Sequence, residues 1–354
     1  MEINDILNAA VKKGASDIHI VVNKTPLARI NGEIQALSEF SEVITVGEAK
    51  RLVYAILNEE QKKHFEEHYG LDCSIQLPGI SRFRVNVLKH KNGIGAVFRA
   101  IPSSIPAPET LKLSEAVVNL AQLPRGLVLV TGPTGSGKST TLACLIDIIN
   151  RTRKDHIITV EDPIEFVYES KSCIVTQREV GSHTHSYTDA LKNALREDPD
   201  VVLVGEMRDL EAISAAITIA ETGHLVLATL HTTDAPSSID RVVDVFPPYQ
   251  QQQIRMQLST SLQAVISQTL IRTIDGNSRV AAREVMIVTQ AIANLIREGK
   301  THQLYQAIEV GDRAGMITLD KSLGHLVRDG IIKIEDALAK AHNPDAVKFA
   351  SKYA

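Results

Sequence analysis

The sequence reads Gly132-Pro-Thr-Gly-Ser-Gly-Lys-Ser-Thr140 near the middle of its 354 residues. This stretch fits the pattern G-x-x-x-x-G-K-[ST], with Gly132, Gly137, Lys138 and Ser139 at the defining positions. In such a loop the glycines let successive backbone N–H groups turn toward a phosphate chain, and the lysine reaches the β- and γ-phosphates. The serine hydroxyl is a Mg²⁺ ligand in this pattern. The stretch therefore predicts a site for a nucleoside triphosphate, ATP, and Mg²⁺. Further contacts to the nucleotide are expected from Thr134, Gly135, Ser136 and Thr140.

The residues on either side of the loop strengthen this prediction. Gly126-Leu-Val-Leu-Val-Thr131 is an apolar, β-branched run of the kind found in buried parallel strands, and Thr140 to Ile149 has the pattern of a helix. A strand, a glycine-rich loop and a helix in this order form the context in which the motif binds phosphate. A chance glycine turn is therefore a poor alternative.

The chain is long enough for two domains with separate cores. Residues 1–100 predict a small α+β domain around an antiparallel sheet. Within it we expect helices over 2–13, 46–57 and 59–68, strands over 16–22, 26–30, 71–77, 80–89 and 94–101, and turns at Asn31-Gly32 and Lys91-Asn92-Gly93.

A proline-rich stretch separates this domain from the next. Residues 101–108 contain three prolines, and such a run continues neither a sheet nor a helix. We therefore predict a linker over 101–112 and a second domain over 113–354. In that domain, β-branched strands ending near residues 131, 161, 205 and 229 alternate with helices, which is the rhythm of a parallel sheet. From about residue 288 to the end the pattern is helical.

Composition narrows the classes of function. A formal net charge of −4 supplies no global basic field for nucleic acid, and the absence of tryptophan with 4% aromatic residues leaves little material for base stacking. The three cysteines, Cys73, Cys144 and Cys173, are far apart, as expected of incidental thiols in a reducing compartment. No leader pattern is evident, and no apolar run reaches the ~18 residues of a membrane span. A cytoplasmic location, or a peripheral one at a membrane, is expected.

Three further strands each run into a chemically useful side chain. Ile157–Val160 leads into Glu161, Val201–Val204 into Glu206, and Leu225–Ala228 into His231. Because ligands of open parallel sheets sit at the carboxyl ends of the strands, these side chains are expected beside the glycine loop. Glu206 is expected to hold a Mg²⁺-bound water or to polarise the attacking water, and Glu161 to orient that water. The division of these roles between the two acids stays open.

The histidines allow two interpretations. His231 is placed either to sense a γ-phosphate or a neighbouring subunit, or to make a structural hydrogen bond. The pair His183 and His185 lacks an evident third ligand, so we predict a polar loop there and not a metal site.

Arginines form another candidate group. Arg82, Arg84 and Arg99 lie in the last two strands of the first domain, and a period of two puts Arg82 and Arg84 on one face. That arrangement suits a polyphosphate, and it equally suits a solvated strand face. Hydrolysis benefits from an arginine finger, for which Arg125 is the second candidate.

These motifs together resemble the secretion ATPase superfamily, and most closely the PilT-type retraction motors of type IV pili. Four boxes match in order and spacing: the Walker A loop 132–140, the acidic box Val160-Glu-Asp-Pro-Ile-Glu165, the Walker B segment Val204-Gly-Glu-Met-Arg-Asp209, and the His box Thr229-Leu-His-Thr-Thr-Asp234. Ala15-Ser-Asp-Ile-His-Ile20 and Arg82-Phe-Arg-Val-Asn86 are similar to the N-terminal domain of that family. The similarity runs across essentially the whole chain.

The resemblance implies a PAS-like N-terminal domain, a RecA-like ATPase domain and a homohexameric ring. It further implies that ATP binds between the two domains and that Arg82, Arg84 and Arg99 complete the site. In this family Glu161 is the favoured water activator and Glu206 the Walker B acid. The implied output is pilus retraction and twitching motility, through an inner-membrane platform protein that keeps the motor peripheral at the membrane, with no specific nucleic acid as partner.

Two features bear on the place of the chain within the family. Extension motors and type II secretion ATPases carry a longer N-terminal region and commonly a four-cysteine metal module, and neither is found here, which favours retraction. The family signature A-I-R-N-L-I-R-E reads Ala291-Ile-Ala-Asn-Leu-Ile-Arg-Glu298 here, so Ala293 replaces an arginine associated with retraction. An extension or secretion paralogue and a nucleic-acid translocase remain as alternatives, and a non-hydrolysing nucleotide switch is a third, against which both Glu161 and Glu206 argue.

Overall fold

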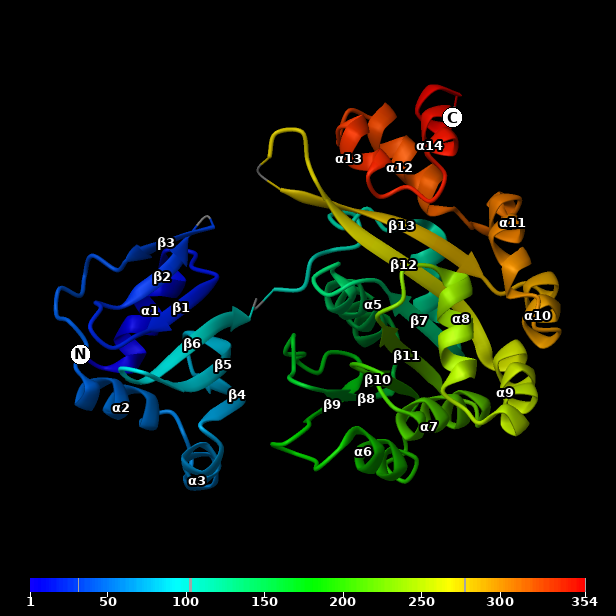
Figure 1. Ribbon diagram of the computed structural model, residues 1–354. Coiled ribbons are helices and arrows are strands. Elements are labelled where there is room, and N and C mark those ends of the chain that lie inside the picture. Colours follow the sequence, from blue (N-terminus) through cyan, green and yellow to red (C-terminus); the bar gives the residue numbers. More distant parts are fainter. Residues whose placement is uncertain (31, 102–103, 277, 354) are drawn as a thin grey trace. The chain divides into compact units, whose positions relative to one another are not determined.

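The structure is a computed structural model that describes residues 1–30, 32–101, 104–276 and 278–353. The chain forms two compact units (Figure 1). The first comprises Met1–Ser104 together with the short segment Glu165–Val167, and the second comprises the rest of the chain from Ile105 onward. Asn31 of the expected first turn, and Pro102 and Ser103 of the expected linker, lie outside the described residues.

The first unit contains one antiparallel sheet with three helices. Its elements are α1 (Ile3–Lys12), β1 (Asp17–Ile20), β2 (Leu27–Ile30), β3 (Glu33–Ala36), α2 (Val46–Tyr54), α3 (Glu59–His68), β4 (Gly70–Leu77), β5 (Ser81–His90) and β6 (Gly93–Ile101). The strand order is β3-β2-β1-β6-β5-β4. One face of the sheet is apolar, and its Phe83 and Phe98 rings pack edge to face with centroids 6.3 Å apart.

Local sequence explains where these helices begin. The Thr45 hydroxyl accepts the N–H of Glu48 at the start of α2. Asn58 and Gln61 form a reciprocal capping box at the start of α3. The expected helices and strands of this unit are confirmed, with ends that differ by a few residues.

The second unit contains a seven-stranded sheet with the order β13-β12-β7-β11-β10-β8-β9. Its strands are β7 (Gly126–Thr131), β8 (His156–Glu161), β9 (Ile174–Glu179), β10 (Val201–Val204), β11 (Leu225–Leu230), β12 (Leu262–Arg272) and β13 (Arg279–Ile287). All neighbouring pairs are parallel except β12 with β13. The α/β fold class with a largely parallel sheet is therefore confirmed, and strands β9, β12 and the antiparallel β13 are additions that the sequence interpretation did not include.

Helices cover this sheet and extend beyond it. They are α4 (Glu115–Asn119), α5 (Lys138–Thr152), α6 (Tyr187–Ala194), α7 (Leu210–Glu221), α8 (Ala235–Asp244), α9 (Pro248–Ser261), α10 (Gln290–Arg297), α11 (Leu304–Glu309), α12 (Leu319–Arg328), α13 (Ile334–Leu338) and α14 (Pro344–Tyr353), with short 3₁₀ turns at Leu120–Gln122, Thr301–Gln303 and Asp312–Ala314. The last helices, α12 to α14, form a separate small core with the β12–β13 hairpin (Figure 1). Among the described residues, no helix is both long enough and apolar enough to traverse a bilayer.

Candidate functional site

The glycine loop joins β7 to α5 as the sequence predicts. Strand β7 is buried along its whole length, and the loop leaves its carboxyl end. Gly132, Gly135 and Gly137 have φ angles of 139°, 77° and 88°, a region that L side chains rarely adopt. Gly137 is the N-cap of α5, so the positive end of that helix faces the loop. The backbone therefore has the form of an anion cradle.

Lys138 and Ser139 begin the helix that follows the loop. The Lys138 ammonium donates to the carbonyl oxygens of Gly132 at 2.8 Å and Pro133 at 3.2 Å, so it lies over the loop. Partial burial lowers the pKa of Lys138, and the nearby charge of Glu206 opposes this. The Ser139 residue is exposed. Both side chains are thus available to a phosphate chain held by the loop.

Glu161 ends β8 as a buried carboxylate in a fixed orientation. It is 5% exposed. Its Oε1 accepts hydrogen bonds from the Thr159 hydroxyl at 2.7 Å and from the Gln177 amide at 3.2 Å. These two donors come from β8 itself and from the neighbouring strand β9, so the sheet sets the direction of the carboxylate. A fixed, largely water-shielded carboxylate is what a water-orienting base requires.

Glu206 follows β10, and its two carboxylate oxygens contact two different side chains. Its Oε2 lies 2.8 Å from Nη2 of Arg208, and its Oε1 lies 2.9 Å from Nε2 of His231. Arg208 also reaches Asp162, with 3.7 Å between Nη1 and Oδ2. Burial acts to raise the pKa of Glu206, but the hydrogen bond and charge of Arg208, with a smaller contribution from His231, hold that pKa below its ordinary value. Glu206 is therefore an ionised carboxylate at neutral pH.

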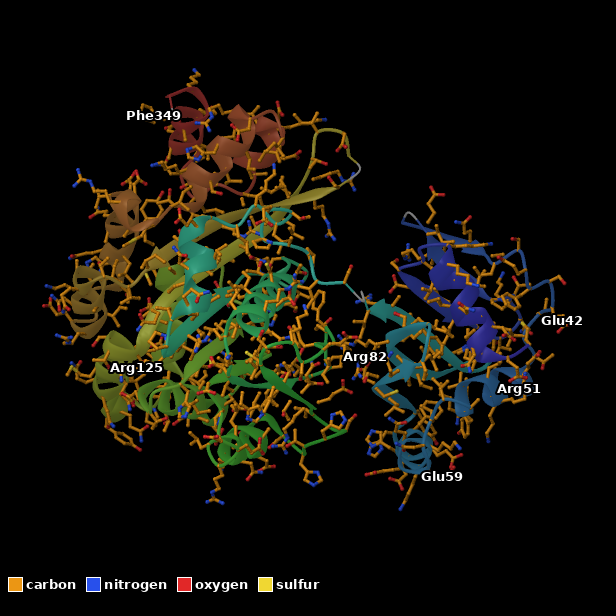
Figure 2. All side chains as sticks on the ribbon, turned by 180° about the vertical axis from the view of Figure 1, so that it is seen from behind. Glu42, Arg51, Glu59, Arg82, Arg125 and Phe349 are labelled. Carbon is orange, nitrogen blue, oxygen red and sulfur yellow. The ribbon has the colours of Figure 1, made fainter. Side chains whose placement is uncertain are left out.

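The sheet order brings these side chains together. Strands β7, β11, β10 and β8 are consecutive neighbours, and the loop with Lys138, then His231, Glu206 and Glu161, follow their carboxyl ends in that order. The sequence prediction of one shared edge is confirmed by this order. Arg125, in contrast, precedes β7 and so lies at the opposite end of that strand from the loop (Figure 2).

The oxygen atoms present fit a hydrated Mg²⁺. Ser139 offers an exposed hydroxyl and Glu206 an ionised carboxylate, and Mg²⁺ prefers oxygen ligands while keeping several waters. Because both Glu206 oxygens already contact nitrogen atoms of Arg208 and His231, this acid is better suited to hold a metal-bound water than to bind the metal directly.

The three candidate arginines belong to the first unit. Arg84 on β5 and Arg99 on β6 are directly opposite each other in the antiparallel register, and Arg99 is opposite Asp17 on β1. Arg99 Nε lies 2.9 Å from Asp17 Oδ1. Arg82, which is labelled in Figure 2 and lies two residues from Arg84, donates to the Ser74 hydroxyl. The face opposite the apolar core thus carries three arginines.

Among the described residues, His183 and the cysteines make local contacts or none that form a site with the glycine loop. His183 Nδ1 accepts the N–H of Glu179, and its loop is polar. Within the part of the chain that the structure describes, no three histidine, cysteine or acidic side chains form a metal cluster. The three cysteines form no disulfide.

Several residues of the site had no role in the sequence interpretation. Arg208 and Asp162 lie inside recognised boxes, but their ion pairs were not predicted. Thr159 and Gln177 orient Glu161. The position of Thr159, two residues before Glu161, is the only sequence signal for either contact. Gln268 donates to the loop carbonyl of Ser136, and no local pattern marks it.

Residues 1–313 match the model of the family described as Type II/IV secretion system protein. Among curated relatives, the type IV pilus retraction ATPase PilT of Pseudomonas aeruginosa is 52% identical over 345 residues, covering 98% of this chain and 99% of the relative. The type IV pilus ATPase PilU of the same organism is 40% identical over 352 residues, covering 99% of this chain and 92% of the relative.

A solved structure shows the same similarity in three dimensions. The crystal structure of the pilus retraction motor PilT with bound ADP superposes with a TM-score of 0.92 at 45% identity, covering 98% of each chain. Since the match includes both units, the expected architecture of an N-terminal sheet domain followed by an ATPase domain applies to the whole chain.

Proposed function

The chain is a PilT-type P-loop ATPase of the Type II/IV secretion system protein family, and from this we propose that it hydrolyses ATP with Mg²⁺ to drive retraction of type IV pili. The similar proteins of Pseudomonas aeruginosa carry the names of a pilus retraction ATPase and a pilus ATPase. The expected family and fold class are confirmed by these matches.

One observation carries the hydrolytic part of the proposal. The glycine loop, His231, Glu206 and Glu161 follow four neighbouring strands in one unit, so binding and hydrolytic groups share one edge of the sheet. A simple nucleotide switch needs the loop but no buried, oriented carboxylate such as Glu161.

The side chains have separable roles in this proposal. Backbone N–H groups of the loop and Lys138 bind the β- and γ-phosphates. Glu161 orients the attacking water and accepts its proton. Glu206 holds a water of the metal shell, and His231, through its contact with Glu206, responds to the state of that carboxylate.

Ser139 and Glu206 are the residues that would hold Mg²⁺ with the nucleotide. When bound, this ion neutralises charge on the β- and γ-phosphate oxygens. Arg82, Arg84 and Arg99 are proposed to add positive charge to the same phosphates in the assembled motor, which the three-arginine face of the first unit supports.

We further propose that the motor is a homohexamer that acts on an inner-membrane platform protein and stays cytoplasmic at that membrane. The 40% identity to PilU keeps another type IV pilus ATPase as the related alternative. Ala293 is 6% exposed on α10, so an arginine at this position would need to leave the packed face of the helix.

Phosphate release by the purified full chain, with and without Mg²⁺, tests the proposal. Lys138→Ala and Glu206→Ala are compared with the parent, and the assembly mass is measured in parallel. We expect a hexamer that hydrolyses ATP only in the presence of Mg²⁺. Both substitutions should abolish this hydrolysis. A protein that binds ATP without turnover would contradict the motor function. Restoration of twitching in a retraction-deficient strain then separates retraction from other pilus roles.

A further inference from the structure

Gln268 lies beside the glycine loop although about 130 residues separate the two in sequence. It follows Ser267 on β12, which pairs with Thr131 at the end of β7, and its side chain is buried at 3% exposure. Its amide nitrogen donates to the Ser136 carbonyl at 2.8 Å, and its amide oxygen accepts from the Thr141 hydroxyl at 2.9 Å. One side chain thus joins the loop to the first turn of α5.

The chemistry of the two partners fixes the orientation of this amide. The Ser136 carbonyl oxygen only accepts hydrogen bonds, so the amide nitrogen must face it. The amide oxygen is then left for Thr141, whose hydroxyl can donate. A methionine or glutamate of similar length cannot make both contacts at neutral pH.

The loop also packs closely against the backbone and the side chain of Gln268. A Cβ added to Gly132 would lie 2.2 Å from the Gln268 carbonyl oxygen, and one added to Gly137 would lie 3.3 Å from the Gln268 amide nitrogen. Two of the defining glycines therefore have a packing reason in addition to their role toward phosphate. The loop therefore packs directly against Gln268.

The hydrogen bond to Ser136 has a consequence on the other side of its peptide group. The Ser136 carbonyl and the Gly137 N–H belong to one planar trans peptide, in which C=O and N–H point in opposite directions. Holding the carbonyl toward Gln268 therefore turns the Gly137 N–H away from β12, toward the phosphate side of the loop. Glycine at 135 and 137 makes this peptide easy to flip, so an external restraint is useful.

We propose that Gln268 is a positioning residue that prevents this peptide flip and so keeps the Gly137 N–H directed at the nucleotide phosphates. The inference rests on the proposed nucleotide-binding function of the loop. According to this inference, strand β12 contributes to nucleotide affinity although it carries no sequence motif. Because β12 continues through β13 to the C-terminal helices, the loop geometry is also tied to that part of the second unit.

Binding of ADP and steady-state ATP hydrolysis by the full chain test the proposal with three variants. Gln268→Met removes both hydrogen bonds and keeps the volume. Loss of an oriented donor to a bound phosphate is expected to raise the Kd for ADP and the KM for ATP about 5- to 30-fold, with much less change in kcat. The control Gln263→Met makes the same change on β12 beside Gly126, at the other end of β7, and is expected to bind as the parent does.

Gln268→Glu separates positioning from a general structural role. An ionised carboxylate repels the Ser136 carbonyl, whereas a protonated carboxyl can donate to it. ADP affinity of this variant, relative to the parent at each pH, is expected to recover as the pH falls. A defect in folding alone would not follow that pH dependence.

The outcomes separate this inference from the proposed function. If the parent binds ADP and Lys138→Ala does not, but Gln268→Met binds as tightly as the parent, the positioning role is wrong and the ATPase proposal stands. If Gln268→Met fails to fold, a pH-independent affinity of Gln268→Glu overturns the inference instead. If the parent binds no nucleotide, both proposals fall.

Discussion

His231 Nε2 lies 2.9 Å from Glu206 Oε1, so the histidine that follows β11 contacts the acid that follows β10. The other Glu206 oxygen contacts Arg208 at 2.8 Å. Both oxygens are therefore engaged, and a shift of either Arg208 or His231 changes the surroundings of the carboxylate. This contact supports the proposed role of His231 in responding to the state of Glu206.

The first prediction concerns the pH dependence of hydrolysis. Arg208 lowers the pKa of Glu206, so Arg208→Ala should raise that pKa. If the ionised carboxylate is required, activity is lost as the pH falls through this pKa, and a raised pKa moves the loss to higher pH. We expect the acid limb of the kcat/KM profile to shift upward in Arg208→Ala but not in the exposed control Arg196→Ala. Superimposable acid limbs would show that Arg208 does not tune the essential group.

The second prediction separates the two acids. Glu161→Gln should lower kcat by about 10²- to 10⁴-fold while ADP affinity persists, because a positioned general base is lost. Glu206→Gln should instead raise the Mg²⁺ concentration needed for half-maximal rate. Magnesium titrations of phosphate release distinguish the two, with the exposed Glu169→Gln as the control. Equal Mg²⁺ requirements in both variants would contradict the assigned division of roles.

The sequence predicted the loop and the strand-end residues because their signals are local. Glycines at fixed spacing after an apolar run indicate the turn, and parallel strands must present their carboxyl ends at one edge. Glu161, Glu206 and His231 follow from that rule alone. Their partners do not, since the contact of Gln177 with Glu161 depends on the register between β8 and β9.

The strands missed in the sequence lack such local signals. Strand β12 begins at Leu262, directly after α9 ends at Ser261, so no turn residues separate helix from strand. Strand β9 is a short edge strand with the polar sequence Ile-Val-Thr-Gln-Arg-Glu. The contact between Gln268 and the loop depends on the pairing of β12 with β7, a long-range feature that periodicity does not encode.

The third prediction compares two loop glycines. A methyl group at Gly132 would lie 2.2 Å from the Gln268 carbonyl oxygen, whereas nothing lies within 4 Å of one at Gly135. Gly132→Ala should therefore abolish ADP binding and lower the melting temperature. Gly135 has a φ of 77°, so Gly135→Ala should lower the stability of the protein by only about 1–2 kcal/mol, through backbone strain. Calorimetric ADP titration and thermal unfolding measure both effects, and equal losses in the two variants would refute the steric argument.

The last prediction concerns Glu284 on β13, which is fully buried and accepts the N–H of Ala235 at 2.8 Å at the start of α8. Burial raises its pKa from an ordinary value of 4.5 to about 7, and the hydrogen bond from Ala235 only partly offsets this. Between these pH values the folded protein keeps a proton that the unfolded chain has lost. The contribution of Glu284 to stability is therefore present below pH 4.5 and is lost as the pH rises toward about 7.

Glu284→Gln keeps a carbonyl oxygen for Ala235 and cannot ionise. At about 1.4 kcal/mol per pKa unit, the variant should be more stable than the parent by up to about 3 kcal/mol at alkaline pH, and equally stable at low pH. Chemical denaturation followed by circular dichroism across the pH range measures this difference, with the exposed Glu309→Gln as the matched control. A difference that stays constant with pH would mean that folding does not shift the pKa of Glu284, and the argument from its burial would be wrong.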